Sequence, residues 1–113
     1  MAGIRSKWTG PETLVHGWLK GRRVRHTMHP NLDGHPDVLI HGVDGRPGVI
    51  VFINGCFWHG CPEHFRPPKT RTRFWVDKID RNRQRQREVV RELSRRYEGV
   101  CEVAVLWEHD LKK

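Results

Sequence analysis

The longest apolar runs of the chain, Val49–Ile53 and Val103–Leu106, have only the length of β-strands. A helix that crosses a membrane needs roughly 20 consecutive apolar residues, and no stretch of this sequence approaches that length. Between the two runs the pattern becomes helical and basic. Strands that alternate with helical segments predict a layered α/β domain, in which helices pack on a sheet.

The remaining elements follow from glycine and proline, which punctuate the 113 residues as one domain over residues 1–113. A first helix is expected from the capping pattern at Thr9–Glu12 to about Gly21. Its apolar stripe would be formed by Leu14, Val15, Trp18 and Leu19. Three short strands then form a predicted meander, at Val24–Met28, Asp37–Ile40 and Val49–Ile53.

A long second helix is predicted from about Thr72 to Arg96, with Gly99 as its stop. Its interrupted apolar face would consist of Phe74, Trp75, Ile79, Val89, Val90, Leu93 and Tyr97. Val100–Trp107 alternates like a strand that is buried on both faces. The resulting order αβββαβ predicts a mixed four-stranded sheet flanked by helices, with sites in the loops at strand ends.

The charge of the chain points to a polyanionic partner. Lys and Arg number 21 against 13 Asp and Glu, which gives a formal net charge of +8. Nucleic acid is the most frequent partner of such a domain, although an acidic membrane surface or simple solubility would also suit this balance. The N-terminus has no apolar segment after its basic residues, so we expect a cytoplasmic protein without a membrane association.

The densest unusual stretch follows the third expected strand and holds two cysteines, two histidines and two aromatic residues. Cys56, Cys61 and His64 are spaced so that a compact loop could bring three ligands to one tetrahedral Zn²⁺. We expect His109 as the fourth ligand, provided that the two apolar strands are parallel neighbours. Cys101, at the start of the last strand, is the competing candidate. Alternatively, the two loop cysteines are ordinary buried thiols.

Pro36-Asp37 is the second chemical signal. A carboxylate at the start of a strand can hold a hard divalent cation beside a phosphate. A Pro-Asp pair is more often a turn, so the signal depends on convergence with Glu12 of the first helix and His59 beyond the third strand. His59 would be the natural proton shuttle.

Taken together, these motifs closely resemble the very short patch repair (Vsr) DNA mismatch endonucleases, over nearly the whole chain. The resemblance rests on Ile4–Lys7, Pro11-Glu12, Pro36-Asp37, Phe52–His64, Phe74-Trp75 with Lys78, Ile79 and Asn82, and Val105–Glu108. It implies a restriction-endonuclease-like (PD-(D/E)XK) fold. It also implies a Mg²⁺-dependent nick in one strand of double-stranded DNA, beside a T:G mismatch left by deamination of 5-methylcytosine, in a protein that zinc stabilises.

The resemblance also implies roles for individual residues. Asp37 matches the magnesium-binding carboxylate, with the main-chain carbonyl of Ile53 as a second ligand. His59 matches the catalytic histidine, and Glu12 matches the acidic residue that supports them. Asn54 is a departure, because relatives carry a histidine or an aspartate there, close to the metal-bound water. An asparagine could orient water but could not act as a base.

The zinc ligands of the family map onto Cys56, Cys61 and His64. The fourth position, usually a cysteine after Trp-Glu, is His109 here, and histidine can replace a thiolate at zinc. The family works as a monomer on DNA, which implies a location at the nucleoid, and mismatch-repair proteins are candidate partners.

Phe57 and Trp58 match aromatic residues that the family inserts into the base stack at the mismatch, although core packing would also explain them. Met1 falls near a further intercalating position, and this chain begins there without the longer N-terminal arm, which we expect to weaken its grip on DNA. Lys69, Arg71 and Arg73 are the cations expected to bind phosphates. Two alternatives stay open: a related phage or mobile-element nicking endonuclease with another specificity, and an inactive zinc-containing DNA-binding module.

Overall fold

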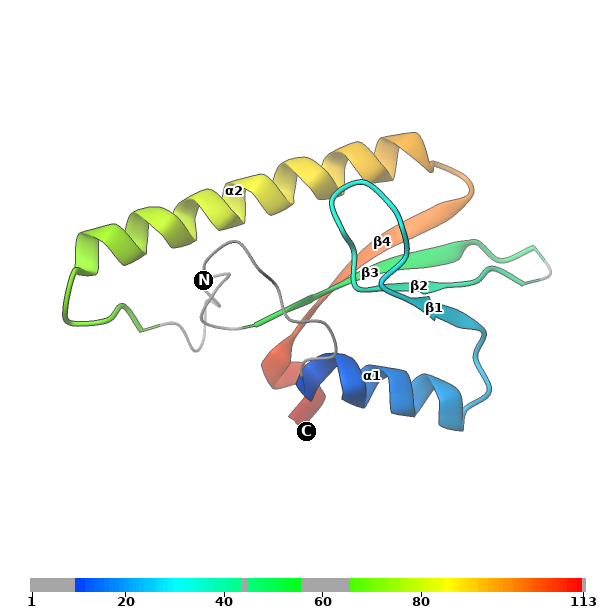
Figure 1. The fold of residues 1–113 in the computed structure, drawn as a ribbon. Helices are drawn as coiled ribbons and strands as arrows, with labels where there is room; N and C mark the ends of the chain where they lie inside the picture. The colour runs from blue at the N-terminus through cyan, green and yellow to red at the C-terminus, as the bar shows by residue number, and fades with distance from the viewer. Residues whose placement is uncertain (1–9, 44, 56–65, 113) are drawn as a thin grey trace.

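The computed structural model describes residues 10–43, 45–55 and 66–112 and contains a four-stranded mixed sheet with helices on both faces (Figure 1). The elements are α1 (Gly10–Gly21), β1 (His26–Met28), β2 (Val38–Ile40), β3 (Gly48–Asn54), α2 (Thr72–Arg96), β4 (Cys101–Trp107) and the short 3₁₀ helix η1 (Glu108–Lys112). This order confirms the predicted αβββαβ arrangement, and each strand lies within two residues of its predicted bounds. In the described part of the chain no helix is long and apolar enough to cross a bilayer.

The strands are ordered β1-β2-β3-β4 across the sheet. β1, β2 and β3 form the expected antiparallel meander, whereas β3 and β4 pair in parallel. A parallel pair requires a crossover connection, and α2 is part of that connection. In the parallel register Asn54 lies opposite Trp107. The segments after β3 and after β4 therefore leave the sheet at the same end, which is the condition on which the choice of His109 depended.

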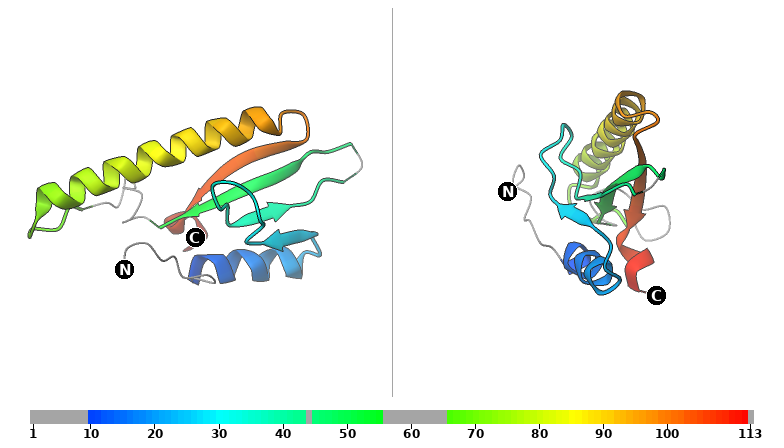
Figure 2. Two further views of the ribbon diagram at one scale, coloured as in Figure 1. Left: turned by 45° about the horizontal axis from the view of Figure 1, so that its top comes forward. Right: turned by 90° about the vertical axis from the view of Figure 1, so that its right-hand side faces the viewer.

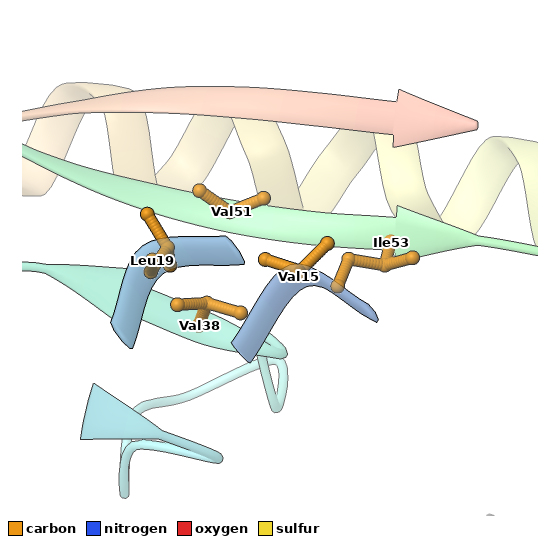
Figure 3. Packing of buried hydrophobic residues seen from close by; sticks show 5 residues of the cluster. All are labelled: Val15, Leu19, Val38, Val51 and Ile53. Atoms are coloured by element: carbon orange, nitrogen blue, oxygen red, sulfur yellow. The ribbon is translucent and has the colours of Figure 1, made fainter. Parts of the chain in front are cut away.

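β3 is the centre of the core because both of its faces are covered. On one face α1 packs Val15 and Leu19 against Val51 and Ile53 of β3 and against Val38 of β2 (Figure 3). Side chains alternate along a strand, so the even-numbered residues of β3 face α2. This two-sided burial explains why β3 is continuously apolar.

On the second face Ile50 and Phe52 of β3 pack with Leu93 of α2. Val103 and Val105 of β4 join this cluster, whereas Leu106 packs on the α1 side, as the alternation predicted. Figure 2 shows α1 and α2 on opposite sides of the sheet. The amino-terminal half of α2 extends past the ends of the strands (Figures 1 and 2).

Three predictions about burial were wrong in part. Leu14 and Trp18 of α1 are more than half exposed, because the narrow buried stripe of this helix consists of Glu12, Val15 and Leu19. Phe74, expected on the apolar face of α2, is 41% exposed because it belongs to the half of the helix that extends past the sheet. β4 is half-buried rather than enclosed, since it is an edge strand of the sheet.

Candidate active site

Asp37 is a buried carboxylate held against the end of β3. Its exposed fraction is 3%. Oδ2 of Asp37 accepts a hydrogen bond of 2.6 Å from the backbone N–H of Ile53, and the N–H of Asp37 donates to the carbonyl of Val51 at 2.9 Å. The predicted magnesium carboxylate therefore lies beside the residue whose carbonyl was expected as the second ligand. The hydrogen bond holds the carboxylate in one orientation, at the edge of the core.

Glu12 is connected to Asp37 through a histidine that the sequence analysis did not identify. Glu12 lies in the first turn of α1 and is 2% exposed. Its Oε1 is 2.6 Å from Nε2 of His29, and the backbone N–H of His29 donates to the carbonyl of Asp37 at 2.8 Å. His29 follows β1, and the pairing of β1 with β2 brings it beside Asp37. The structure thus brings Glu12 and Asp37 to one region, whereas His59, the third member of the predicted convergence, lies outside the described residues.

Asn54, the residue that departs from the family, is buried at the last position of β3. Its Nδ2 donates to Oε1 of Gln86 on α2 at 2.8 Å, and Nε2 of Gln86 donates back to Oδ1 of Asn54 at 2.6 Å. Two amides that exchange two hydrogen bonds fix each other's orientation. Because neither amide titrates, this pair is neutral at every pH at which the protein folds. Gln86 was missed because it is 32 positions away along the chain.

We expect Gln86→Ala to lower the free energy of unfolding by about 1–3 kcal/mol, since the buried amide of Asn54 loses its partner. Urea unfolding measures the effect. Gln84→Ala is the matched control, because Gln84 is an exposed glutamine of the same helix. Equal stability of the two variants would contradict this role of Gln86.

The four predicted zinc ligands can be followed only in part. Cys56, Cys61 and His64 lie outside the described residues, whereas His109 follows β4 within η1. Its Nε2 is 3.4 Å from Oδ1 of Asp110. Among the residues that the structure describes, no three His, Cys, Asp or Glu side chains form a metal-binding group. The zinc site therefore remains a prediction.

Cys101, the competing fourth ligand, begins β4 and lies opposite Gly48, at the end of the sheet far from Asn54. The seven residues of β4 separate the two ends of the strand by about 20 Å. Cys56 follows Asn54 by two positions and can reach no more than about 7 Å from it. The topology therefore favours His109 over Cys101.

Of the expected DNA contacts, Lys69, Arg71 and Arg73 are exposed beside and within the first turn of α2. Arg71 occupies the N-cap position, and its guanidinium lies 4.3 Å from the ring centre of Phe74. The catalytic candidate His59 lies outside the described residues, as do the proposed wedge residues Phe57, Trp58 and Met1.

The donors around Asp37 fit a magnesium ion. Mg²⁺ prefers oxygen ligands and is commonly bound through one or two carboxylates, with water and substrate phosphate completing its shell. Asp37 supplies a buried carboxylate that contacts the backbone of Ile53, the residue whose main-chain carbonyl is the expected second ligand. A cation would also offset part of the cost of burying the Asp37 charge.

Comparisons with known proteins point to DNA endonucleases. The family model described as DNA mismatch endonuclease Vsr matches residues 1–64. The type II nicking enzyme V.NaeI of Lentzea aerocolonigenes is 45% identical over 97% of this chain and 66% of its own length. V.XorIIP of Xanthomonas oryzae, also named a type II nicking enzyme, is 34% identical over 98% of this chain and 78% of its own length. The DNA mismatch endonuclease Vsr of Escherichia coli is 32% identical over 99% of this chain and 69% of its own length.

Proposed function

Because the chain belongs to the Vsr family of DNA endonucleases, we propose that it nicks one strand of double-stranded DNA beside a T:G mismatch. The observation that carries the proposal is the buried carboxylate of Asp37, which the N–H of Ile53 fixes at the end of β3. The chain spans about two thirds of the length of V.NaeI. The proposed activity is therefore that of these 113 residues and not that of the longer relative.

Asp37 and the carbonyl of Ile53 would hold Mg²⁺, which when bound supplies a Lewis acid for the phosphodiester. The hydrogen bond from Ile53 to Oδ2 keeps the Asp37 carboxylate from turning away from this position. Glu12 supports the backbone of Asp37 indirectly. Its partner His29 donates a backbone hydrogen bond to the carbonyl of Asp37. These contacts preorganise the site before DNA arrives.

Asn54 would orient the attacking water, and its two hydrogen bonds with Gln86 would fix the amide for that purpose. An amide can neither take up nor release a proton near neutral pH, so the proton transfer falls to His59.

Recognition of the mismatch would come from Phe57 and Trp58, which stack on bases opened at the weak T:G pair. Lys69, Arg71 and Arg73 would bind phosphates, since all three are exposed near the start of α2. The zinc site of Cys56, Cys61, His64 and His109 would join the segment after β3 to the segment after β4. In this way the metal would hold Phe57 and Trp58 near the end of the sheet that carries Asn54.

A second candidate function is nicking at another site or structure. The names of V.NaeI and V.XorIIP, type II nicking enzymes, favour it, as does asparagine at position 54 where the resemblance implies histidine or aspartate. Both candidates share the chemistry at Asp37 and differ only in the DNA that is recognised.

The test is a nicking assay on three matched duplexes that carry T:G, T:A or C:G at one position, in Mg²⁺ and in EDTA. We expect Mg²⁺-dependent nicking of the T:G duplex alone. Cleavage of all three duplexes would favour the second candidate. Binding of the T:G duplex without cleavage would identify an inactive binding module and contradict both.

A further inference from the structure

A basic hollow lies at the end of β1 and β2 that is far from Asp37. It has a volume of about 440 Å³ and is lined by Lys20, Arg23, Val24, Arg25, His26 and His41. These residues come from the end of α1, the turn after it, the start of β1 and the residue after β2. None of them belongs to the site around Asp37.

Among the described residues, no carboxylate neutralises the cations of the basic hollow. The sequence contains no Asp or Glu between Glu12 and Asp33. Within the described part of the chain, no ion pair involves Lys20, Arg23 or Arg25. Concave surfaces lined by one sign of charge concentrate counter-ions, so the basic hollow attracts anions.

The arginines near the end of α2 are arranged differently. Near the end of α2, Arg96 binds Asp33 at 2.8 Å and Glu92 at 3.1 Å. The hydrogen bond from Arg96 to Asp33 is the main cause that raises the pKa of Arg96 above its usual value. Arg95 also pairs with Glu92. Within the described residues, the basic hollow thus differs from the end of α2 in having no such carboxylate partners, which makes its guanidinium groups suited to an anionic ligand.

The backbone holds the walls of the basic hollow in place. Arg23 has a φ of 59°, a left-handed conformation that glycine adopts more easily than arginine. Its N–H donates to the carbonyl of Lys20 at 3.1 Å. Nδ1 of His26 lies 2.7 Å from the carbonyl oxygen of Val24, and Nε2 of His26 lies 2.9 Å from Nδ1 of His16. The strained backbone at Arg23 favours a use for its side chain.

We propose that the basic hollow binds a backbone phosphodiester of the DNA duplex, away from the phosphate that is cleaved. Guanidinium groups match the geometry of phosphate oxygens and bind them strongly. Asp37 and His41 flank β2 and are about 13 Å apart along it. A duplex carries about one negative charge per 1.7 Å of its axis, so DNA bound at Asp37 brings other phosphates within this range. The inference rests on the proposed function, since it requires duplex DNA at Asp37.

The test compares two double variants that each remove two positive charges. Arg23→Gly with Arg25→Ala removes both arginines from the basic hollow, and glycine suits the left-handed position of residue 23. Arg91→Ala with Arg95→Ala is the control, from the exposed surface of α2, which packs on the other face of the sheet. Binding to T:A and T:G duplexes is measured in EDTA over a range of salt concentrations. The slope of log K against log[salt] changes by about 0.9 for each DNA phosphate that the protein no longer neutralises.

We expect the variant of the basic hollow to lose about 10-fold or more in affinity for both duplexes, with a salt slope that is smaller by about 1 to 2. The control should retain its slope within about 0.5. Equal changes in both variants, or no change in either, would overturn the proposal. Stabilisation of the wild type by millimolar inorganic phosphate, lost in the variant without a change in the DNA slope, would indicate a small-anion site and also overturn it. Because this experiment measures binding in the absence of cleavage, failure of this proposal can be distinguished from failure of the proposed nicking activity.

Discussion

Replacing Asp37 by asparagine is expected to lower the nicking rate at least about 10³-fold while the protein stays folded. The carboxylate is the proposed magnesium ligand, and a catalytic metal supplies several kcal/mol of transition-state stabilisation. A loss of about 4 kcal/mol corresponds to about 10³-fold in rate. The amide oxygen of the substituted side chain can still accept the hydrogen bond from the N–H of Ile53. Single-turnover nicking of a T:G duplex measures the rate, and thermal unfolding checks the fold.

Asp37→Ala separates the catalytic role of this carboxylate from its structural role. It should be as inactive as Asp37→Asn, but it should also lose about 1–3 kcal/mol of stability, because the N–H of Ile53 is left without its acceptor. If Asp37→Asn nicked within about 10-fold of the wild-type rate, Asp37 would not be the metal carboxylate. Inactivity with a large drop in melting temperature in both variants would make the residue structural only.

Removal of zinc is expected to have a large effect on stability. The chain should contain close to one zinc ion per molecule and unfold when a strong chelator removes it. Structural zinc contributes about 10–16 kcal/mol in small zinc-finger peptides, whereas whole domains are stable by only about 5–15 kcal/mol. Metal analysis and thermal unfolding before and after chelation measure the effect. A folded chain without zinc would contradict the assignment.

The fourth ligand can be identified by a matched pair of variants. His109→Ala should lower the zinc content and the melting temperature, because it removes the ligand after β4. Cys101→Ala should leave the zinc content unchanged, since Cys101 lies at the opposite end of β4. Loss of zinc in Cys101→Ala and its retention in His109→Ala would reverse the assignment.

The fold was largely predictable because its signals are local. The capping pattern before α1, the continuous apolar run of β3 and the stop at Gly99 each depend on neighbouring residues. Leu14 and Trp18 show the limit of this approach. The helical period places both beside Val15 and Leu19, but only tertiary packing decides how wide a stripe the sheet covers.

Only those residues of the candidate site that belong to a sequence motif were predictable. Asp37, Glu12 and Asn54 could be identified from the sequence, and the structure places all three as buried polar residues. His29 and Gln86 could not, because each reaches its partner through tertiary structure. A histidine before a proline and a glutamine on a polar helix carry no signal of their own. A buried asparagine at the end of a strand needs hydrogen-bond partners, and this requirement is the only sequence-level hint of Gln86.

The most direct test of the central claim is strand-resolved nicking of one duplex that carries a single T:G mismatch, with each strand labelled in turn. The account predicts a single Mg²⁺-dependent break, confined to the mismatched T strand, that EDTA abolishes and Asp37→Asn lacks. Breaks in both strands, or no break by zinc-loaded protein that binds the duplex, would contradict it.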